Sequence, residues 1–298
     1  MGQHHHNHHS HNHGSASERM GWAFFLNFGF TIVEFIGGWL TNSTAIMADA
    51  VHDLGDSISI GSAWLLGRLG DKQADQTYTY GYKRLSLFGA LINGLVLVVG
   101  SAWVLTMAIP RLFDPVMPHT EGMFLLAILG VAVNGYAAYR LSGGKTLNEK
   151  VLNWHLIEDV LGWVAVLVVS VVMHFVDWPI LDPLLSVGFT LFILFNVLRN
   201  LKTTAQLFFQ ATPDKKLLTD IEQKLLAARG VAGVHHIHLW SLDGEHHVLS
   251  AHINTEPSFP ISQYSQLKSN LTQVLREFEL SHTTLEIELS DEQCRINS

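Results

Sequence analysis

Charged residues are scarce in this sequence. Only 15% of the 298 residues are Asp, Glu, Lys or Arg, whereas soluble domains carry about 25%. Hydrophobic residues make up 48%, and nearly all of the long apolar runs fall between residues 20 and 201. This uneven deficit excludes an ordinary soluble protein and indicates a membrane domain followed by a soluble one.

Cysteine is nearly absent, and the sequence has no excess of basic residues. Cys294 is the single cysteine, so an internal disulfide and a cysteine-based zinc finger are both excluded. We interpret it as a free cytosolic thiol near the terminus. The formal net charge of −8 argues against nucleic acid as a partner.

Histidine, by contrast, is abundant. Seven of the 18 histidines lie between His4 and His13, interrupted by Asn and Ser. This irregular spacing favours a disordered, metal-attracting tail over residues 1–19. A purification tag is the alternative, although tags are usually uniform.

Six apolar segments are long enough to cross a bilayer. They lie at 20–40, 44–66, 82–109, 122–141, 152–175 and 180–201. With the N-terminus in the cytoplasm, ten cations near the ends of these segments stay inside and only Arg111 lies outside. The ten are Arg19, Arg68, Lys72, Lys83, Arg84, Arg140, Lys145, Lys150, Arg199 and Lys202. Because Lys and Arg are retained in the cytoplasm, we expect both termini there.

The C-terminal part has the pattern of a small α+β domain. Residues 215–228 and 261–278 predict amphipathic helices, whereas 234–241, 247–254 and 283–289 alternate as strands. The resulting αββαβ order is that of an open-faced, ferredoxin-like sandwich, as in metallochaperones. We therefore expect a tail (1–19), a six-helix transmembrane domain (20–205) and a cytosolic domain (206–298).

Ionisable residues inside apolar segments are functional candidates, because each costs roughly 2.5–3.5 kcal/mol at the bilayer centre. The pattern His-x-x-x-Asp occurs twice, as His52 with Asp56 and as His155 with Asp159. Residues i and i+4 share one face of a helix. Two facing pairs would supply two imidazoles and two carboxylates, enough for tetrahedral Zn²⁺. Polar contacts between helices are the structural alternative.

Other acidic residues neighbour these pairs. Asp53 and Glu158 are candidates for positioning the ligands or lining the cavity, with simple helix contacts as the alternative. Asp49 is a similar candidate or a helix-start residue. Glu34 is isolated in the first segment, and we interpret it as a contact within the helix bundle.

At these residues the sequence resembles the cation diffusion facilitator family of zinc transporters, in its bacterial form with a His-rich N-terminus. The shared motifs are Asn27, EFIGG at 34–38, STA at 43–45, ADAVHDLGD at 48–56, TYGYKR at 79–84, GALING at 89–94, the helix of His155 and Asp159, VHHIHLW at 234–240, LSAH at 249–252 and HTTLEIE at 282–288. The resemblance covers nearly the whole chain after the His-rich tail.

The resemblance implies a homodimer that exports metal from the cytoplasm by proton antiport with alternating access. It implies a transported ion on His52, Asp56, His155 and Asp159. In the cytosolic domain it implies regulatory zinc sites on His238, His252, His282 and Glu288, with His235 as a further candidate. The short connection at 142–151 lacks the His-rich insert of many eukaryotic relatives, which favours a bacterial inner membrane.

The types of metal ligand indicate which ion is transported, and the missing catalytic motifs argue against an enzyme. Imidazole suits Zn²⁺, then Cd²⁺, and permits Co²⁺ or Ni²⁺, whereas all-oxygen sites suit Mn²⁺. The apolar segments contain neither the Glu-x-x-His of di-iron sites nor the His-Glu-x-x-His of zinc proteases, so we do not expect an enzyme. The alternative to an exporter is a membrane-embedded zinc sensor or metalloenzyme without flux.

Overall fold

The computed structural model describes residues 13–70, 72–141, 147–257, 259–290, 292 and 294. The described chain forms two compact units. The first comprises residues up to Leu66 together with 89–201, and the second comprises 67–88 and the residues from Lys202 onward. Residues 1–12 of the expected His-rich tail lie outside the described residues, and the first helix already begins at His13.

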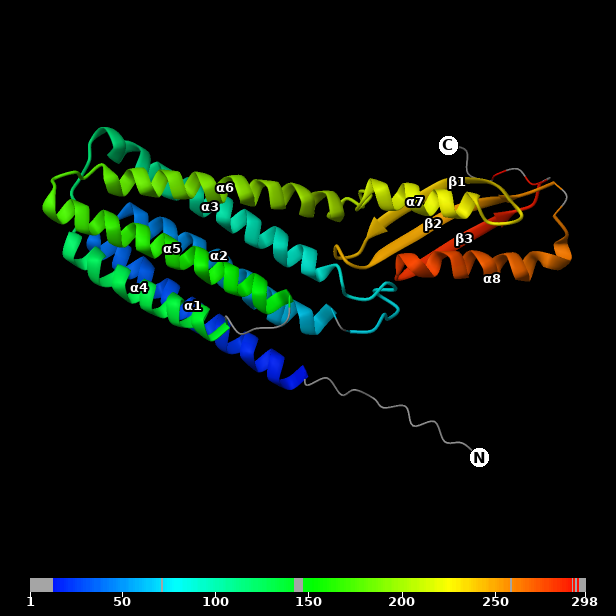
Figure 1. The fold of residues 1–298 in the computed structure, drawn as a ribbon, viewed down its shortest axis with the longest axis horizontal. Coiled ribbons are helices and arrows are strands. Elements are labelled where there is room, and N and C mark those ends of the chain that lie inside the picture. The colour runs from blue at the N-terminus through cyan, green and yellow to red at the C-terminus, as the bar shows by residue number, and fades with distance from the viewer. Residues whose placement is uncertain are drawn as a thin grey trace, which may run out of the picture. The chain divides into compact units, whose positions relative to one another are not determined.

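Six long helices correspond to the six apolar segments of the sequence (Figure 1). They are α1 (His13–Thr41), α2 (Thr44–Gly70), α3 (Leu85–Phe113), α4 (Thr120–Leu141), α5 (Leu147–Phe175) and α6 (Leu181–Phe208). The sequence predicts that the third segment ends before Pro110, but α3 continues through this residue to Phe113. Proline is tolerated in membrane helices because local adjustments satisfy the freed carbonyl.

The outer surface of the first unit is apolar. Large side chains such as Phe25, Trp39 and Phe195 are exposed, which suits a lipid environment but not water. Among the described residues, five helices are long and apolar enough to cross a membrane: α1, α3, α4, α5 and α6. Helix α2 is present at full length, but its charged residues lower its apolar character. These residues are therefore the feature of α2 that needs a functional explanation.

The first turn of α2 is held by a side chain from α6. Asp182 accepts hydrogen bonds from the Thr44 backbone N–H (2.8 Å), the Thr44 hydroxyl (2.7 Å), the Ala45 N–H (3.2 Å) and the Ser43 hydroxyl. An N-terminal turn has unpaired N–H groups and a positive dipole end, so a buried carboxylate there is stabilised. This bonding fixes the N-terminal end of α2 against α6.

A close approach between α4 and α5 depends on Gly130. A Cβ atom at this position would lie 2.1 Å from the ring of Trp163, and Trp163 is fully buried. The indole therefore lies directly against the α4 backbone, surrounded by Ala45, Ile46, Met123, Ala127 and Val166. This packing sets the position of α5, which carries the second His-x-x-x-Asp pair.

The second unit has the predicted αββαβ order. Its elements are α7 (Lys215–Leu226), β1 (Val231–Ser241), β2 (His247–Thr255), α8 (Tyr264–Leu275) and β3 (His282–Glu288). The sheet order is β1-β2-β3, with β1 antiparallel and β3 parallel to β2. Leu249, Ala251 and Ile253 pack with Leu225 of α7 and Leu271 of α8. Because side chains alternate along a strand, Ser250, His252 and Asn254 lie on the opposite face of the sheet.

Candidate metal centres

The two His-x-x-x-Asp pairs meet inside the first unit. Asp56 Oδ2 lies 3.5 Å from His52 Nε2 on its own helix and 2.9 Å from His155 Nε2 on α5. Asp159 lies 3.8 Å from both imidazoles. One ligand atom from each of the four residues lies within 4.8 Å of all the others. The helical repeat brings each pair to one face, and the packing of α2 with α5 brings the faces together.

The surroundings of these four residues fit a bound cation. Asp159 is buried, and the other three side chains are 20–27% exposed. Within the described chain, Asp159 Oδ1 and His52 Nδ1 are buried without a hydrogen-bond partner. Phe189 of α6 lies edge-on to His52 at 5.8 Å between ring centroids. A cluster of two imidazoles and two carboxylates with unpaired buried atoms has the donor set of a zinc site.

The neighbouring acidic residues do not belong to this group of four. Asp53 and Asp49 are buried on α2, whereas Glu158 is exposed on α5. Asp49 and Glu158 line a cavity of about 310 Å³ together with Gly162 and Phe189. The structure therefore places Glu158 and Asp49 at a cavity beside the cluster. Asp53 lies next to α1, because its backbone carbonyl accepts a hydrogen bond from Asn27.

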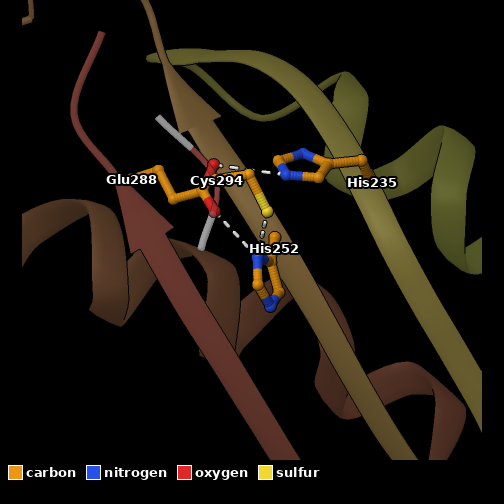
Figure 2. A group of neighbouring side chains, drawn as sticks. All are labelled: His235, His252, Glu288 and Cys294. Carbon is orange, nitrogen blue, oxygen red and sulfur yellow. Dashed lines mark hydrogen bonds and ion pairs between the residues drawn. The ribbon is translucent and has the colours of Figure 1, made fainter. Parts of the chain in front are cut away.

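A second cluster lies in the second unit, on the sheet face opposite α7 and α8. Figure 2 shows His235 of β1, His252 of β2, Glu288 of β3 and the downstream Cys294 pointing toward one another. Glu288 contacts His252 Nδ1 at 2.8 Å and His235 Nε2 at 3.2 Å. Cys294 Sγ lies 3.6 Å from His252 Nδ1. Two nitrogens, one oxygen and one sulfur within 4.8 Å of one another also match zinc ligands.

An irregularity in β1 builds this cluster. His235 pairs with His252 and His238 with Ser250, so the register shifts by one residue between them. His236, within the shift, has a φ of +46°, a conformation that costs energy for a residue other than glycine. The rings of His235, His236 and His252 all lie 5.2 Å apart. A regular strand would direct adjacent residues to opposite faces, so the bulge gathers the imidazoles.

Two residues carried over from the family resemblance, His238 and His282, lie outside this group. His238 follows the bulge, is exposed, and lines a separate cavity of about 340 Å³ with Trp240. His282 begins β3 opposite Val248, six residues before Glu288, which is roughly 20 Å along a strand. Its ring lies 5.4 Å from that of Tyr80. Neither histidine joins His235, His252 and Glu288.

Cys294 is the ligand candidate that the sequence analysis missed. The sequence predicts Cys294 as a free thiol near the terminus; in the structure it forms no disulfide, and its sulfur lies beside His252. The signal available in the sequence was its position six residues beyond Glu288, close enough to fold back onto the same site.

Electrostatics keep Glu288 ionised. Burial acts to raise the pKa of Glu288, but hydrogen bonds with His252 and Cys294 and the nearby charge of His235 outweigh it. The result is a pKa below the ordinary 4.5. A carboxylate that is ionised near neutral pH is available as a metal ligand.

Comparison with known proteins agrees with this architecture. The family model of the cation efflux transmembrane domain matches residues 22–209, and that of the cation efflux protein cytoplasmic domain matches 213–290. A cadmium, cobalt and zinc/H(+)-K(+) antiporter from Bacillus subtilis is 32% identical over 270 residues, covering 89% of this chain and 87% of the relative. The metal cation efflux system protein CzcD from Cupriavidus metallidurans is 30% identical over 264 residues, covering 88% and 83%.

Two further matches show the same similarity. The zinc transporter ZitB from Pectobacterium atrosepticum is 29% identical over 296 residues, covering 97% of this chain and 91% of the relative. Among solved structures, the metal-bound C-terminal domain of the C. metallidurans CzcD transporter is 27% identical, covers 24% of this chain and 97% of that chain, and has a TM-score of 0.22. The chain therefore belongs to the cation efflux family and is a multi-pass membrane transporter with a cytoplasmic domain, not an enzyme.

Proposed function

We propose that this protein exports divalent metal ions, Zn²⁺ first among them, in exchange for protons. The observation that carries the proposal is the group of His52, Asp56, His155 and Asp159, whose ligand atoms lie within 4.8 Å of one another on two membrane helices. The relatives named as zinc transporters and as a cadmium, cobalt and zinc antiporter support the same assignment.

The donor set supports zinc over harder ions. Two imidazoles and two carboxylates can complete a tetrahedral site for Zn²⁺, and the same set accepts Cd²⁺ and, less readily, Co²⁺ or Ni²⁺. Mn²⁺ prefers oxygen ligands, so His52 and His155 disfavour it.

Proton exchange follows from the chemistry of the ligands. His52 and His155 must be neutral and Asp56 and Asp159 ionised to hold the ion, so metal entry displaces protons and metal release takes them up. A site that alternates between the two sides of the membrane would then couple the two flows. The membrane voltage contributes about 2.3 kcal/mol per charge per 100 mV.

The proposal includes an orientation and an assembly. The ten cations near the span ends favour cytoplasmic termini in a bacterial inner membrane, and the cytoplasmic-domain match supports it for the C-terminal part. We propose a homodimer in which the cytoplasmic domain tightens the contact when zinc rises. Equal dimer affinity with and without zinc would contradict that part.

The His235, His252, Glu288 and Cys294 group supports a regulatory zinc role for the cytoplasmic domain. These side chains come from all three strands and from the segment after β3. Zinc held there would cross-link the strands to the end of the chain, because ligand bonds formed only in the folded state stabilise it. The Cys294 thiol must lose its proton to bind the ion, so we expect binding at this site to weaken as pH falls.

Flux in proteoliposomes tests the function. Zinc accumulation and proton movement are measured together in vesicles that hold the purified full-length protein, beside Cd²⁺, Co²⁺, Ni²⁺ and Mn²⁺. We expect zinc to move against a proton flow and Mn²⁺ to move least. A sensor would bind zinc yet move neither ion, and that outcome would refute the exporter.

A further inference from the structure

Glu34 of α1 is a fully buried carboxyl group that the proposed metal site does not use. Its side chain is 0% exposed, and neither of its oxygens accepts a hydrogen bond from any described residue. Glu34 does contact another helix of the bundle, as the sequence indicated, because Asp53 of α2 lies within hydrogen-bonding reach. A buried carboxyl group without a donor or a cation requires another partner.

The groups around Glu34 are acidic. Asp53 and Asp49 of α2 and Asp159 of α5 are the charged groups that act on it. On the side of α4, the α1 helix contacts apolar Leu126, next to Gly37. Two carboxylates cannot bond to each other, since both are acceptors, but a protonated carboxyl can donate to an ionised one. The contact between Glu34 and Asp53 therefore has a place for one proton.

A row of polar side chains continues from this pair along the interface of α1 and α2. Asn27 donates to the Ser57 hydroxyl at 3.0 Å and to the Asp53 carbonyl at 3.1 Å. The Thr31 and Ser57 hydroxyls lie 3.5 Å apart. Asn27, Thr31 and Glu34 are spaced three or four residues apart, so they lie on one face of α1. Hydroxyl groups that can both donate and accept thus lie about one helical turn from the carboxyl pair.

We propose that Glu34 binds one of the protons that the transporter exchanges for metal, separately from the four metal ligands. The inference rests on the proposed function. A cation at the His52 cluster lies beside Asp159, whose charge already acts on Glu34, so metal entry favours the ionised form of Glu34. The O–H bond of Glu34 breaks, the proton leaves, and the carboxylate remains. When the metal departs, the carboxylate takes up a proton again.

The test counts protons per zinc in proteoliposomes. Glu34→Gln keeps the shape of the side chain but cannot lose a proton. We expect the variant to bind zinc and to exchange zinc for zinc across the vesicle membrane, which needs no net proton transfer. During net zinc transport, a pH-sensitive dye should report about one proton fewer per zinc than in the wild type. Glu121→Gln, at an exposed carboxyl in the first turn of α4, is the matched control and should keep the wild-type count.

The outcomes separate this inference from the proposed function. Absence of zinc flux in the wild type would refute the exporter itself. A wild-type proton count in Glu34→Gln would overturn the role of Glu34 alone, as would a folded variant that no longer binds zinc. If Glu34→Gln does not fold, Glu34→Asp serves as the second test variant. Glu34→Asp should keep the wild-type number of protons per zinc but shift the pH midpoint of transport. An unchanged midpoint would overturn the inference.

Discussion

His155 Nε2 lies 2.9 Å from Asp56 Oδ2, which joins the ligand pair of α5 to that of α2. Each aspartate thus serves both helices, so removing either one leaves an incomplete site. We predict that Asp56→Ala and Asp159→Ala each reduce zinc flux to the background of empty vesicles. Both variants should keep the wild-type elution profile in detergent, since the packing of Trp163 against Gly130 and the bonds of Asp182 to α2 are unchanged. Wild-type flux in both variants would exclude the site.

His155→Asp should change which ion is transported. The substitution replaces an imidazole by a carboxylate and makes the site three-quarters oxygen, which favours harder ions. We expect the ratio of Mn²⁺ to Zn²⁺ transport to rise by about tenfold or more, the size of effect that one ligand change produces in a metal site. Competition between the two ions in proteoliposomes measures it. The same ratio in variant and wild type would remove His155 from the ligand set.

Cys294→Ser should weaken zinc binding in the cytoplasmic domain. The experiment uses the full chain with Asp56→Ala and Asp159→Ala already present, so that calorimetry reports the second cluster. Loss of the thiolate should lower zinc affinity about tenfold to a hundredfold, and His235→Ala should do the same. His238→Ala and His282→Ala are matched controls outside the cluster and should leave the affinity unchanged. The reverse pattern would favour the residues that the family resemblance suggested.

The turn between β1 and β2 should lose protection from hydrogen exchange at acid pH. Burial acts to raise the pKa of Asp243, but hydrogen bonds from the His246 and Glu245 backbones and from the His246 ring hold it below the ordinary 3.8. Stabilisation by the ionised group is therefore present above pH 3.8 and is lost as pH falls through the lower folded value.

Asp243→Asn measures this contribution because the amide is neutral at every pH. Hydrogen exchange of residues 244–247 should be about threefold faster in the variant near neutral pH, since charge-assisted hydrogen bonds are the stronger ones. The difference should vanish at pH values below the folded pKa. A difference that persists there would mean that shape, not charge, holds the turn.

Asp182→Ala should destabilise the membrane unit. Four donors at the start of α2 lose their acceptor, and a lost cap with charged hydrogen bonds costs about 2 kcal/mol. The apparent melting temperature in detergent should fall, whereas Asp114→Ala, at an exposed acid after α3, should have little effect. Equal melting temperatures in the two variants would contradict the capping role.

Local patterns predicted the membrane part of the molecule well. Apolar length indicated all six helices, and the four-residue spacing placed His52 with Asp56 and His155 with Asp159 on shared faces. Whether these residues hold an ion stays a prediction. The same acidic residues that indicated the site keep α2 below the apolarity of a membrane span. The sequence could not place Glu34 beside Asp53, because that contact depends on how two helices pack.

In the cytoplasmic domain, the sequence could not predict which distant residues meet at the candidate metal site. The strand pattern indicated β1, β2 and β3, but alternation cannot locate a bulge. The shift at His236 brings His235 onto the face of His252 and leaves His238 opposite Ser250. Cys294 follows the last strand, where no periodic pattern exists. The bulge in β1 and the position of Cys294 beside His252 bring these residues together. Neither feature can be predicted from the pattern of a single sequence.

The bonding of Asp182 to the first turn of α2 has a mechanical consequence. Those bonds join the N-terminal end of α2, which bears two candidate ligands, to the beginning of α6. Any tilt of α2 that opens the ion pathway to one side must either break several buried bonds together or rotate α6 with it. We therefore expect α2 and α6 to move together at that end during the transport cycle.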